Sequence, residues 1–251
     1  MSVIYEKPKT LNDKPNMFCP GCGHSIICRI IAESVEELGI EKDVIFIVPI
    51  GCGGMMGYYL DYDAVSSLHG RAPAVATGVK RMRPDKIVIC FQGDGDLASI
   101  GTAETIHSAN RGEHFTTIFA NNTVFGMTGG QMAPTTLVGQ PSTTTVGGRD
   151  PEKQVGYPLD MCSIINQLKA PKYIERCALD TVPHIKKAKA AIKKALQYQM
   201  EDIGYSFVEL LGACPTQLGL SPIKSMERIT NEMIPAFPIG VYREPGKEEV
   251  K

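Results

Sequence analysis

Short apolar runs alternate with helical patterns along most of this chain, and no other feature of the sequence constrains the fold as strongly. The runs at residues 44–49 (VIFIVP), 87–91 (IVICF) and 115–120 (FTTIFA) are rich in β-branched and aromatic residues and are apolar on both faces. Such runs are typical of parallel strands, which are buried on both sides. Residues 173–178 and 205–211 predict two further strands.

Helical patterns lie between these predicted strands. Apolar residues recur at helical spacing from Ile27 until Gly39 ends the pattern. We predict further helices at residues 98–109, 161–168 and 183–200. This alternation predicts an α/β fold with a doubly wound, mostly parallel sheet that is covered by helices on both faces.

The length and the irregular segments bound the domain organisation. A chain of 251 residues can bury a full core, and we interpret residues 1–251 as a single domain. Residues 121–150 lack periodicity and are dense in Gly, Thr and Pro, which indicates a functional loop that we expect to cover a cofactor. The residues after Pro235 are predicted to form an irregular C-terminal arm.

The charge balance and the apolar pattern exclude several classes of partner. With 26 Lys and Arg against 27 Asp and Glu, the net charge of -1 does not favour nucleic acid or an anionic membrane surface. No apolar run approaches the roughly 20 residues that cross a bilayer, and the first residues lack the apolar stretch of a signal peptide. We therefore expect a cytoplasmic protein whose eight cysteines are reduced thiols, metal ligands or both.

A glycine-flanked acidic motif follows the predicted strand at residues 87–91. Residues 92–96 (QGDGD) lead into a predicted helix, so backbone N–H groups and a positive helix end lie just beyond the strand. Phosphate binds at such positions, and Asp94 can supply a carboxylate oxygen to Mg²⁺. On its own, the tripeptide GDG is as consistent with a tight turn and a solvated acid.

A second motif at the end of the next predicted strand favours the metal interpretation. The run at 115–120 ends in Asn121 and Asn122, with 25 residues between Gly95 and Asn121. That length accommodates one helix and one strand. Parallel neighbours joined by a crossover helix bring both loops to the same edge of the sheet, so Asp94 and Asn122 can meet at one ion.

Four cysteines are placed to meet at that same edge. Cys19 and Cys22 form a CPGC turn, whose spacing lets two thiolates face one metal centre. Cys52 and Cys214 each stand just past the end of a predicted strand. This spacing alone fits a structural zinc site as well as an iron–sulfur cluster. The remaining cysteines lie within predicted helices or strands and are assigned to the core: they are Cys28, Cys90, Cys162 and Cys177.

Taken together, these motifs resemble a known family. The pair GDG and NN is similar to the thiamine diphosphate motif. The segments FCPGCGH, PIGCGG, LHGRAPAVATGVK, QGDGDLASIGTAE, ANNTVFGMTGGQMAPTT and GACPT resemble the beta subunit of 2-oxoacid:ferredoxin oxidoreductases, in the 2-ketoisovalerate and 2-oxoglutarate branch. The resemblance covers nearly the whole chain. It implies one thiamine-diphosphate-binding domain with an N-terminal CxxC segment for a cluster.

The resemblance also implies which residues form the site. The Mg²⁺ ligands would be side-chain oxygens of Asp94 and Asn122 and the backbone carbonyl of Val124. His69 would be catalytic, beside the diphosphate or the reacting centre, whereas the other histidines, His24 among them, are expected at helix or surface positions. A 4Fe–4S cluster would be bound by Cys19, Cys22, Cys52 and Cys214. Further contacts to thiamine diphosphate would come from Ile50, Gly51, Cys52, Gly53, His69, Gly93, Gly95, Asp96, Gly126 and Met127.

The activity that the resemblance implies is oxidative decarboxylation of a 2-oxoacid with coenzyme A to an acyl-CoA and CO₂. Electrons would pass through the cluster to a ferredoxin. Thiamine enzymes also need a glutamate against the aminopyrimidine ring, which implies a pyrimidine-binding alpha subunit, with gamma and delta subunits completing the complex. Two alternatives stay open: a non-redox thiamine diphosphate decarboxylase subunit, which leaves the cysteines without a role, and a zinc-stabilised binding module, which leaves the Mg²⁺ motif without one.

Overall fold

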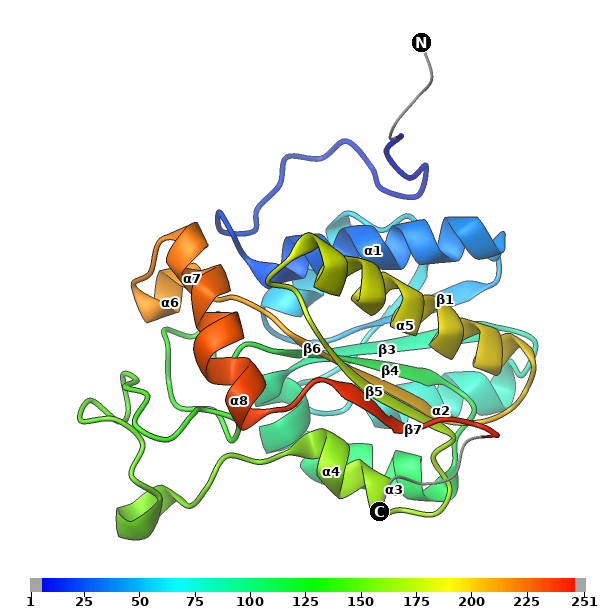
Figure 1. The fold of residues 1–251 in the computed structure, drawn as a ribbon. Helices are drawn as coiled ribbons and strands as arrows, with labels where there is room; N and C mark the ends of the chain where they lie inside the picture. Colours follow the sequence, from blue (N-terminus) through cyan, green and yellow to red (C-terminus); the bar gives the residue numbers. More distant parts are fainter. Residues whose placement is uncertain (1–5, 247–251) are drawn as a thin grey trace.

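The computed structural model describes residues 6–246, and a β-sheet lies at the centre of this part of the chain. There the sheet has seven strands in the order β2-β1-β3-β4-β6-β5-β7 (Figure 1). Neighbouring strands are parallel except β7, which is antiparallel to β5. The strands are β1 (Val44–Val48), β2 (Asp63–Ser66), β3 (Ile87–Gly93), β4 (Thr116–Asn121), β5 (Tyr173–Ala178), β6 (Ser206–Leu211) and β7 (Gly240–Arg243).

Helices cover both faces of the sheet, which confirms the predicted α/β fold. Helices α1 and α5 lie on one face, and α2, α3 and α4 lie on the other (Figure 1). No helix within residues 6–246 is long and apolar enough to span a membrane. The helices are α1 (Gly23–Leu38), α2 (Ala72–Met82), α3 (Thr102–Arg111), α4 (Met161–Asn166), α5 (Val182–Met200), α6 (Pro215–Leu218), α7 (Pro222–Arg228) and α8 (Ile234–Ala236).

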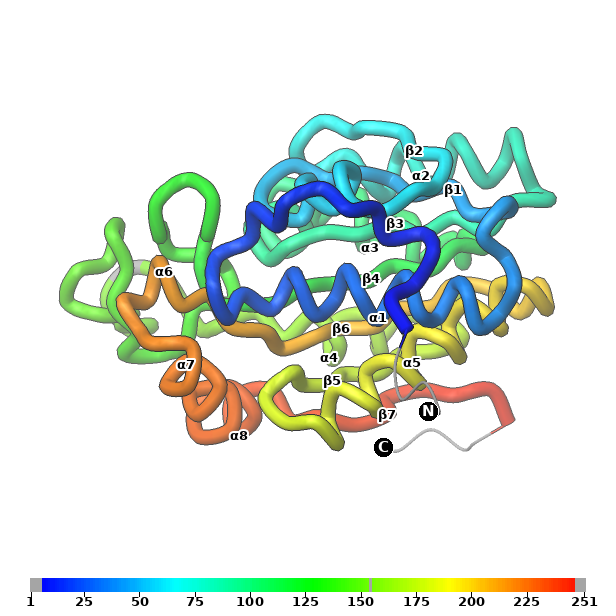
Figure 2. Tube along the Cα trace, turned by 90° about the horizontal axis from the view of Figure 1, so that it is seen from above, coloured from blue at the N-terminus to red at the C-terminus, as the bar shows by residue number. Residues whose placement is uncertain are grey.

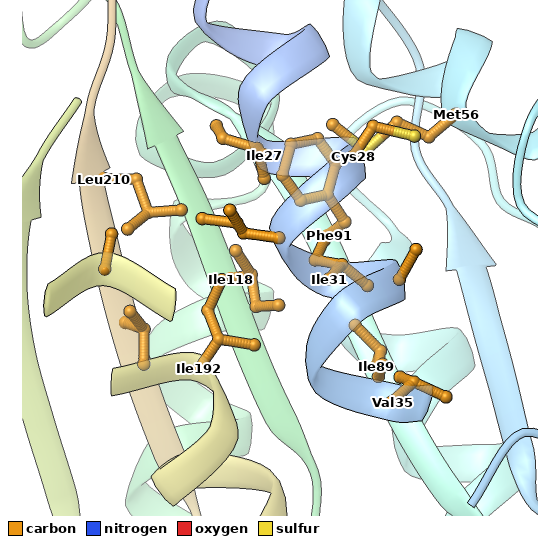
Figure 3. Packing of buried hydrophobic residues seen from close by; sticks show 14 of the residues in the cluster. Ile27, Cys28, Ile31, Val35, Met56, Ile89, Phe91, Ile118, Ile192 and Leu210 are labelled. Atoms are coloured by element: carbon orange, nitrogen blue, oxygen red, sulfur yellow. The ribbon is translucent and has the colours of Figure 1, made fainter. Parts of the chain in front are cut away.

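The core between α1, α5 and the sheet shows why the strands are apolar on both faces. Ile27 and Ile31 of α1 and Ile192 of α5 pack in one cluster with Phe91 of β3 and Ile118 of β4 (Figure 3). All five side chains are at most 1 % exposed. Each such burial stabilises the fold by about 1.5–3 kcal/mol. A second cluster packs α2, α3 and α4 against the opposite face, so alternate residues of the same strands must be apolar too.

The structure corrects the sequence prediction at the edges of the sheet. Strand β2 and helix α2 are not predicted, and every residue of β2 is exposed, so this edge strand lacks the pattern of a buried one. The predicted irregular arm after Pro235 is wrong for β7, which pairs with β5. An edge strand contacts the sheet on one side only, so its sequence need not be apolar on both faces. The last part of that arm, residues 247–251, lies outside the described residues.

The strand order brings the predicted functional loops to one end of the sheet. Strands β1, β3, β4 and β6 are parallel, so the loops that follow them open at the same end. The chain passes from β1 outward to β2 and then returns to β3 on the other side of β1, and ligands bind at such a switch in strand order. The N-terminal segment runs alongside α1 (Figure 2). It delivers the CPGC turn to this end, where the Gly23 N–H donates to the Ala213 carbonyl at 3.1 Å.

Candidate active site

The loops at the carboxyl ends of the strands form a cleft that contains most of the predicted site residues. A larger cavity of about 1140 Å³ lies between residues 137–146 and helices α6 to α8, but the cysteine and GDG motifs do not line it. We therefore take the smaller cleft as the candidate site. It is lined by His24, Ile50, Gly51, Cys52, Gly53, His69, Gly93, Asp94, Gly95, Asp96, Asn122, Phe125, Gly126, Met127 and Thr128.

Asp94 lines this cleft and accepts several backbone hydrogen bonds. Its side chain is 3 % exposed. Oδ1 accepts from the Gly95 N–H at 2.8 Å, and Oδ2 accepts from the N–H groups of Val124 at 2.9 Å and Asn122 at 3.2 Å. Burial raises the pKa of the Asp94 carboxyl to about 7, although these N–H groups act against the rise. Within residues 6–246 no cationic side chain pairs with Asp94, and a buried carboxylate in such surroundings is suited to binding a cation.

Side-chain and backbone oxygens converge beside Asp94. The Asn122 amide places one atom 2.8 Å from the Val124 carbonyl oxygen and 3.0 Å from Asp94 Oδ2. If that atom is nitrogen, the amide donates to both oxygens; if it is oxygen, three oxygens face one another. A cation stabilises the second arrangement, and carboxylate, amide and carbonyl oxygens are suitable ligands for Mg²⁺. Asp94, Asn122 and Val124 therefore fit the predicted metal site.

Asp96 anchors the loop that carries His69. Its Oδ1 accepts from the His69 Nδ1–H and from the Gly70 N–H, the latter at 2.7 Å, and its Oδ2 accepts from Gln92 Nε2 at 2.7 Å. The contact between His69 Nδ1 and Asp96 fixes the orientation of the imidazole ring. The side chain of His69 is 31 % exposed and lines the cleft. Gln92, fully buried beneath Asp96, is a supporting residue that the sequence pattern did not reveal.

Two of the four predicted cluster cysteines, Cys52 and Cys214, meet beside Gly126, and the other two, Cys19 and Cys22, interact with them electrostatically. A Cβ atom at Gly126 would lie 3.6 Å from the Sγ atoms of both Cys52 and Cys214, so these sulfurs flank one space. Cys22 interacts electrostatically with Cys19 and Cys52, and Cys214 interacts with Cys22 and Cys52. Burial raises the pKa of Cys22 to about 11 and that of Cys214 to about 12, and the neighbouring thiols add to both shifts.

The described structure does not contain a ready-made site for a single metal ion among these thiols. Within residues 6–246, no group of three or more His, Cys, Asp or Glu side chains is arranged to hold one metal ion. Four thiolates around one zinc stand about 4 Å apart, whereas an iron–sulfur cube holds its cysteine ligands farther apart. Thiols that burial keeps neutral become ligands when a metal compensates their charge. The cysteines predicted for the core are all buried: Cys28, Cys90, Cys162 and Cys177.

His24 lies in a helix, as expected, but it is also buried and lines the cleft, which the sequence did not indicate. It lies in the first turn of α1, is 4 % exposed, and places Nδ1 3.5 Å from Cys22 Sγ. Its ring packs against the rings of Phe18 and Phe91. Burial lowers the pKa of His24 to about 4, so the imidazole is neutral at pH 7. The one signal in the sequence that His24 belongs to the site was its position two residues after Cys22. Its contact with Phe91 is not visible in the sequence, because the two residues become neighbours only when the chain folds.

Comparisons with known proteins show which family the chain belongs to. Residues 49–210 match the family described as "Thiamine pyrophosphate enzyme, C-terminal TPP binding domain". The chain is 38% identical to the 2-oxoglutarate synthase subunit KorB of Methanocaldococcus jannaschii, over 82% of this chain and 72% of that protein. The chain belongs to the 2-oxoacid:ferredoxin oxidoreductase family. The family resemblance drawn from the motifs is therefore confirmed.

Further members of the 2-oxoacid:ferredoxin oxidoreductase family differ in length. The ketoisovalerate oxidoreductase subunit VorA of Methanothermobacter marburgensis is 48% identical over 92% of this chain. The chain spans about half of that protein, 48% of its length. The solved structure of 2-oxoglutarate:ferredoxin oxidoreductase from Magnetococcus marinus, with 2-oxoglutarate, coenzyme A and succinyl-CoA bound, matches with a TM-score of 0.77 and 27% identity. That match covers 98% of this chain and 87% of the other.

Proposed function

We propose that this family member is the thiamine-diphosphate-binding beta subunit of an enzyme that oxidatively decarboxylates a 2-oxoacid with coenzyme A. Electrons pass through a 4Fe–4S cluster to a ferredoxin. The observation that carries the proposal is the meeting of two motifs at one edge of the sheet: the oxygens around Asp94 and the sulfurs around Gly126. The names of the relatives support 2-ketoisovalerate and 2-oxoglutarate as substrates. On this proposal, residues 1–251 form one domain.

Diphosphate binding would depend on a metal ion and on backbone N–H groups. The described residues that line the cleft include no Lys or Arg. The negative charge of a diphosphate would therefore be compensated by Mg²⁺ and by the N–H groups of the turn that begins at Asp96. Gly95 is required immediately before that turn, because a Cβ atom there would lie 2.3 Å from the Phe125 ring.

The residues of this chain would bind the cofactors and place a proton-accepting group beside the reacting centre. Bound thiamine diphosphate would supply a nucleophilic carbon and an electron sink, and the cluster would supply a one-electron acceptor. Asp94, Asn122 and the Val124 carbonyl would hold Mg²⁺. His69, oriented by Asp96, would accept or hold a proton at Nε2 beside the reacting centre. The cluster would be held by Cys19, Cys22, Cys52 and Cys214.

The rest of the active site would come from a pyrimidine-binding alpha subunit, and gamma and delta subunits would complete the complex. The described lining of the cleft contains no Glu, although thiamine chemistry needs a glutamate against the aminopyrimidine ring. Apolar side chains are exposed at and beside the cleft: Ile50 is 44% exposed, Met127 55% and Leu68, next to His69, 78%. Exposed apolar side chains of this kind are typical of a surface that binds another protein, which supports the proposed alpha subunit. Reduced thiols and a ferredoxin acceptor support a cytoplasmic location.

Binding of thiamine diphosphate tests the cofactor half of this proposal. Asp94→Ala and Asn122→Ala should each remove most of the Mg²⁺-dependent binding, because each deletes an oxygen ligand. Asp180→Ala removes a buried carboxylate that pairs with His184 outside the cleft, so it should leave binding unchanged. Calorimetric titration with the cofactor at fixed MgCl₂ measures the effect. Wild-type affinity in Asp94→Ala would place the metal site elsewhere.

An absorption spectrum of the anaerobically purified protein separates the proposed function from its alternatives. An iron–sulfur protein shows a broad band in the blue part of the visible range that bleaches on reduction. A non-redox thiamine decarboxylase subunit or a zinc-stabilised module shows none. Turnover assays of the whole complex with pyruvate, 2-oxoglutarate, 2-ketoisovalerate and aryl oxoacids would then identify the substrate.

A further inference from the structure

Thr123, which lies between Asn122 and Val124, has a strained backbone. Its φ angle is 65°, and within residues 6–246 the one other residue besides glycine with a positive φ is Asp202. A β-branched residue is rarely found in this left-handed region, because its Cβ crowds the backbone. Such a conformation persists only when the surroundings enforce it, and it often marks a functional turn.

Every polar atom of Thr123 has a buried partner that opposes relaxation of this turn. The Thr123 N–H donates to Asn121 Oδ1 at 3.1 Å. Its carbonyl accepts from Thr136 Oγ1 at 2.6 Å and from Gln140 Nε2 at 2.9 Å. Its hydroxyl accepts from Arg228 Nη2 at 3.3 Å. Thr123, Asn121 and Thr136 are all 0% exposed.

Two buried ionic residues, Glu209 and Arg228, in turn bind these partners. On one side, Glu209 Oε1 accepts from Asn121 Nδ2 at 2.8 Å, while Glu209 Oε2 accepts from Arg176 Nε at 2.8 Å. On the other side, Arg228 Nη2 donates to Gln140 Oε1 at 2.8 Å. Glu209 and Arg176 are each 1% exposed. Arg176 also pairs with Asp160, so Glu209 is not its sole carboxylate partner.

We propose that Glu209, acting through Asn121, and Thr136, acting on the carbonyl, are positioning residues that hold Thr123 in its strained conformation. That conformation sets the direction of the Val124 carbonyl and of the Asn122 side chain toward the cation. None of these positioning residues lines the cleft. The inference rests on the proposed function in one respect, which is that the cation is the Mg²⁺ that accompanies thiamine diphosphate.

Without the hydrogen bonds from these positioning residues, the Val124 carbonyl and the Asn122 side chain would no longer be oriented toward the cation. In Glu209→Gln, an NH₂ group that cannot accept replaces one of the two carboxylate oxygens, so Asn121 and Arg176 cannot both keep their acceptor and the Asn121 side chain is less firmly fixed. Thr123 can then relax to a negative φ, which rotates the peptide that leads to Val124. Residues that orient metal ligands from behind typically change metal affinity about 10- to 100-fold when mutated.

A matched control separates positioning from general destabilisation. Asp160→Asn removes the other carboxylate partner of Arg176 and weakens the cap of α4, where Asp160 Oδ1 accepts from the Ser163 N–H at 3.0 Å. It leaves the bond between Glu209 and Asn121 in place. Asp160→Asn should therefore lower thermal stability without changing the Mg²⁺ requirement. Thr136→Val is a second test variant with little change in volume, and it deletes one hydrogen bond to the Thr123 carbonyl.

The experiment is calorimetric titration of thiamine diphosphate over a series of MgCl₂ concentrations, on the chain purified with any subunit that accompanies it. Glu209→Gln and Thr136→Val should each raise the MgCl₂ concentration for half-saturation at least about tenfold. In a Thr123→Gly background, where the left-handed conformation carries no Cβ penalty, the effect of Glu209→Gln should shrink. If wild type binds normally and both variants match Asp160→Asn, or if the Thr123→Gly background changes nothing, the inference is wrong. If wild type shows no Mg²⁺-dependent binding, the proposed function fails instead.

Discussion

Replacing Asp94 by asparagine should stabilise the metal-free chain at pH 8 while abolishing Mg²⁺-dependent cofactor binding. Burial raises the pKa of this carboxyl from its ordinary value of 3.8 to about 7 in the folded chain. The folded state therefore retains a proton that the unfolded state releases between these two pH values. The stability that Asp94 contributes is fully present below about pH 4 and is lost as the pH rises through 7. The difference between a pKa of 3.8 and one of about 7 corresponds to roughly 4 kcal/mol.

The asparagine variant avoids this loss because its side chain does not ionise. It introduces a different loss, since an amide cannot accept from both Gly95 and Val124 as the carboxylate does. An unsatisfied donor of this kind costs about 1–2 kcal/mol. At pH 5 the unfolded chain has already released the Asp94 proton, so wild type has lost about 1.5 kcal/mol. This roughly equals the loss in the variant, and the two proteins should have similar free energies of unfolding. At pH 8 the variant should be more stable by about 2 kcal/mol.

Urea denaturation in EDTA at pH 5 and pH 8 measures this difference. Asp43→Asn, at an exposed carboxylate, is the control and should show no comparable dependence on pH. MgCl₂ with thiamine diphosphate should then stabilise wild type but not Asp94→Asn, because a ligand stabilises only the protein that binds it. The reasoning is refuted if the variant is no more stable than wild type at pH 8, or if the difference is the same at both pH values.

Further predictions concern the cluster and the partner subunit. Cys214→Ala should lose iron and sulfide as severely as Cys19→Ala, whereas Cys90→Ala should keep both and lose about 1 kcal/mol of core packing; iron analysis and urea denaturation decide. Gly126→Val should reduce the iron content several-fold, because its side chain would fill the space between the Cys52 and Cys214 sulfurs, and wild-type iron would exclude that geometry. The chain freed of other subunits should not reduce methyl viologen with a 2-oxoacid and coenzyme A, and turnover by the isolated chain would rule out a shared active site.

Much of the fold could be predicted because the central strands are buried on both faces, and such strands appear in the sequence as continuous apolar runs. The runs that became β1, β3 and β4 are apolar at successive positions, since α1 and α5 cover one face and α2, α3 and α4 the other. Edge strands β2 and β7 are covered on fewer sides and so carry no such pattern. Their place in the sheet depends on pairing with distant strands, which spacing along the chain does not encode.

The same distinction applies to the site. The ends of β3 and β4 carry Asp94 and Asn122 within a short motif, so parallel pairing alone predicts that they meet. The support behind them involves partners far apart in sequence: Asn121 bonds to Glu209, and His24 packs on Phe91. No spacing rule connects such residues.

The sequence by itself determined the α/β class, the edge of the sheet where the motifs meet, and the family, because each depends on hydrophobic period or on short motifs at strand ends. The tertiary structure alone decided which buried groups fix those motifs. It also showed that the Thr123 turn is held in a strained conformation. The physical reason is that backbone strain and buried hydrogen bonds depend on three-dimensional packing, in which residues distant along the chain become neighbours.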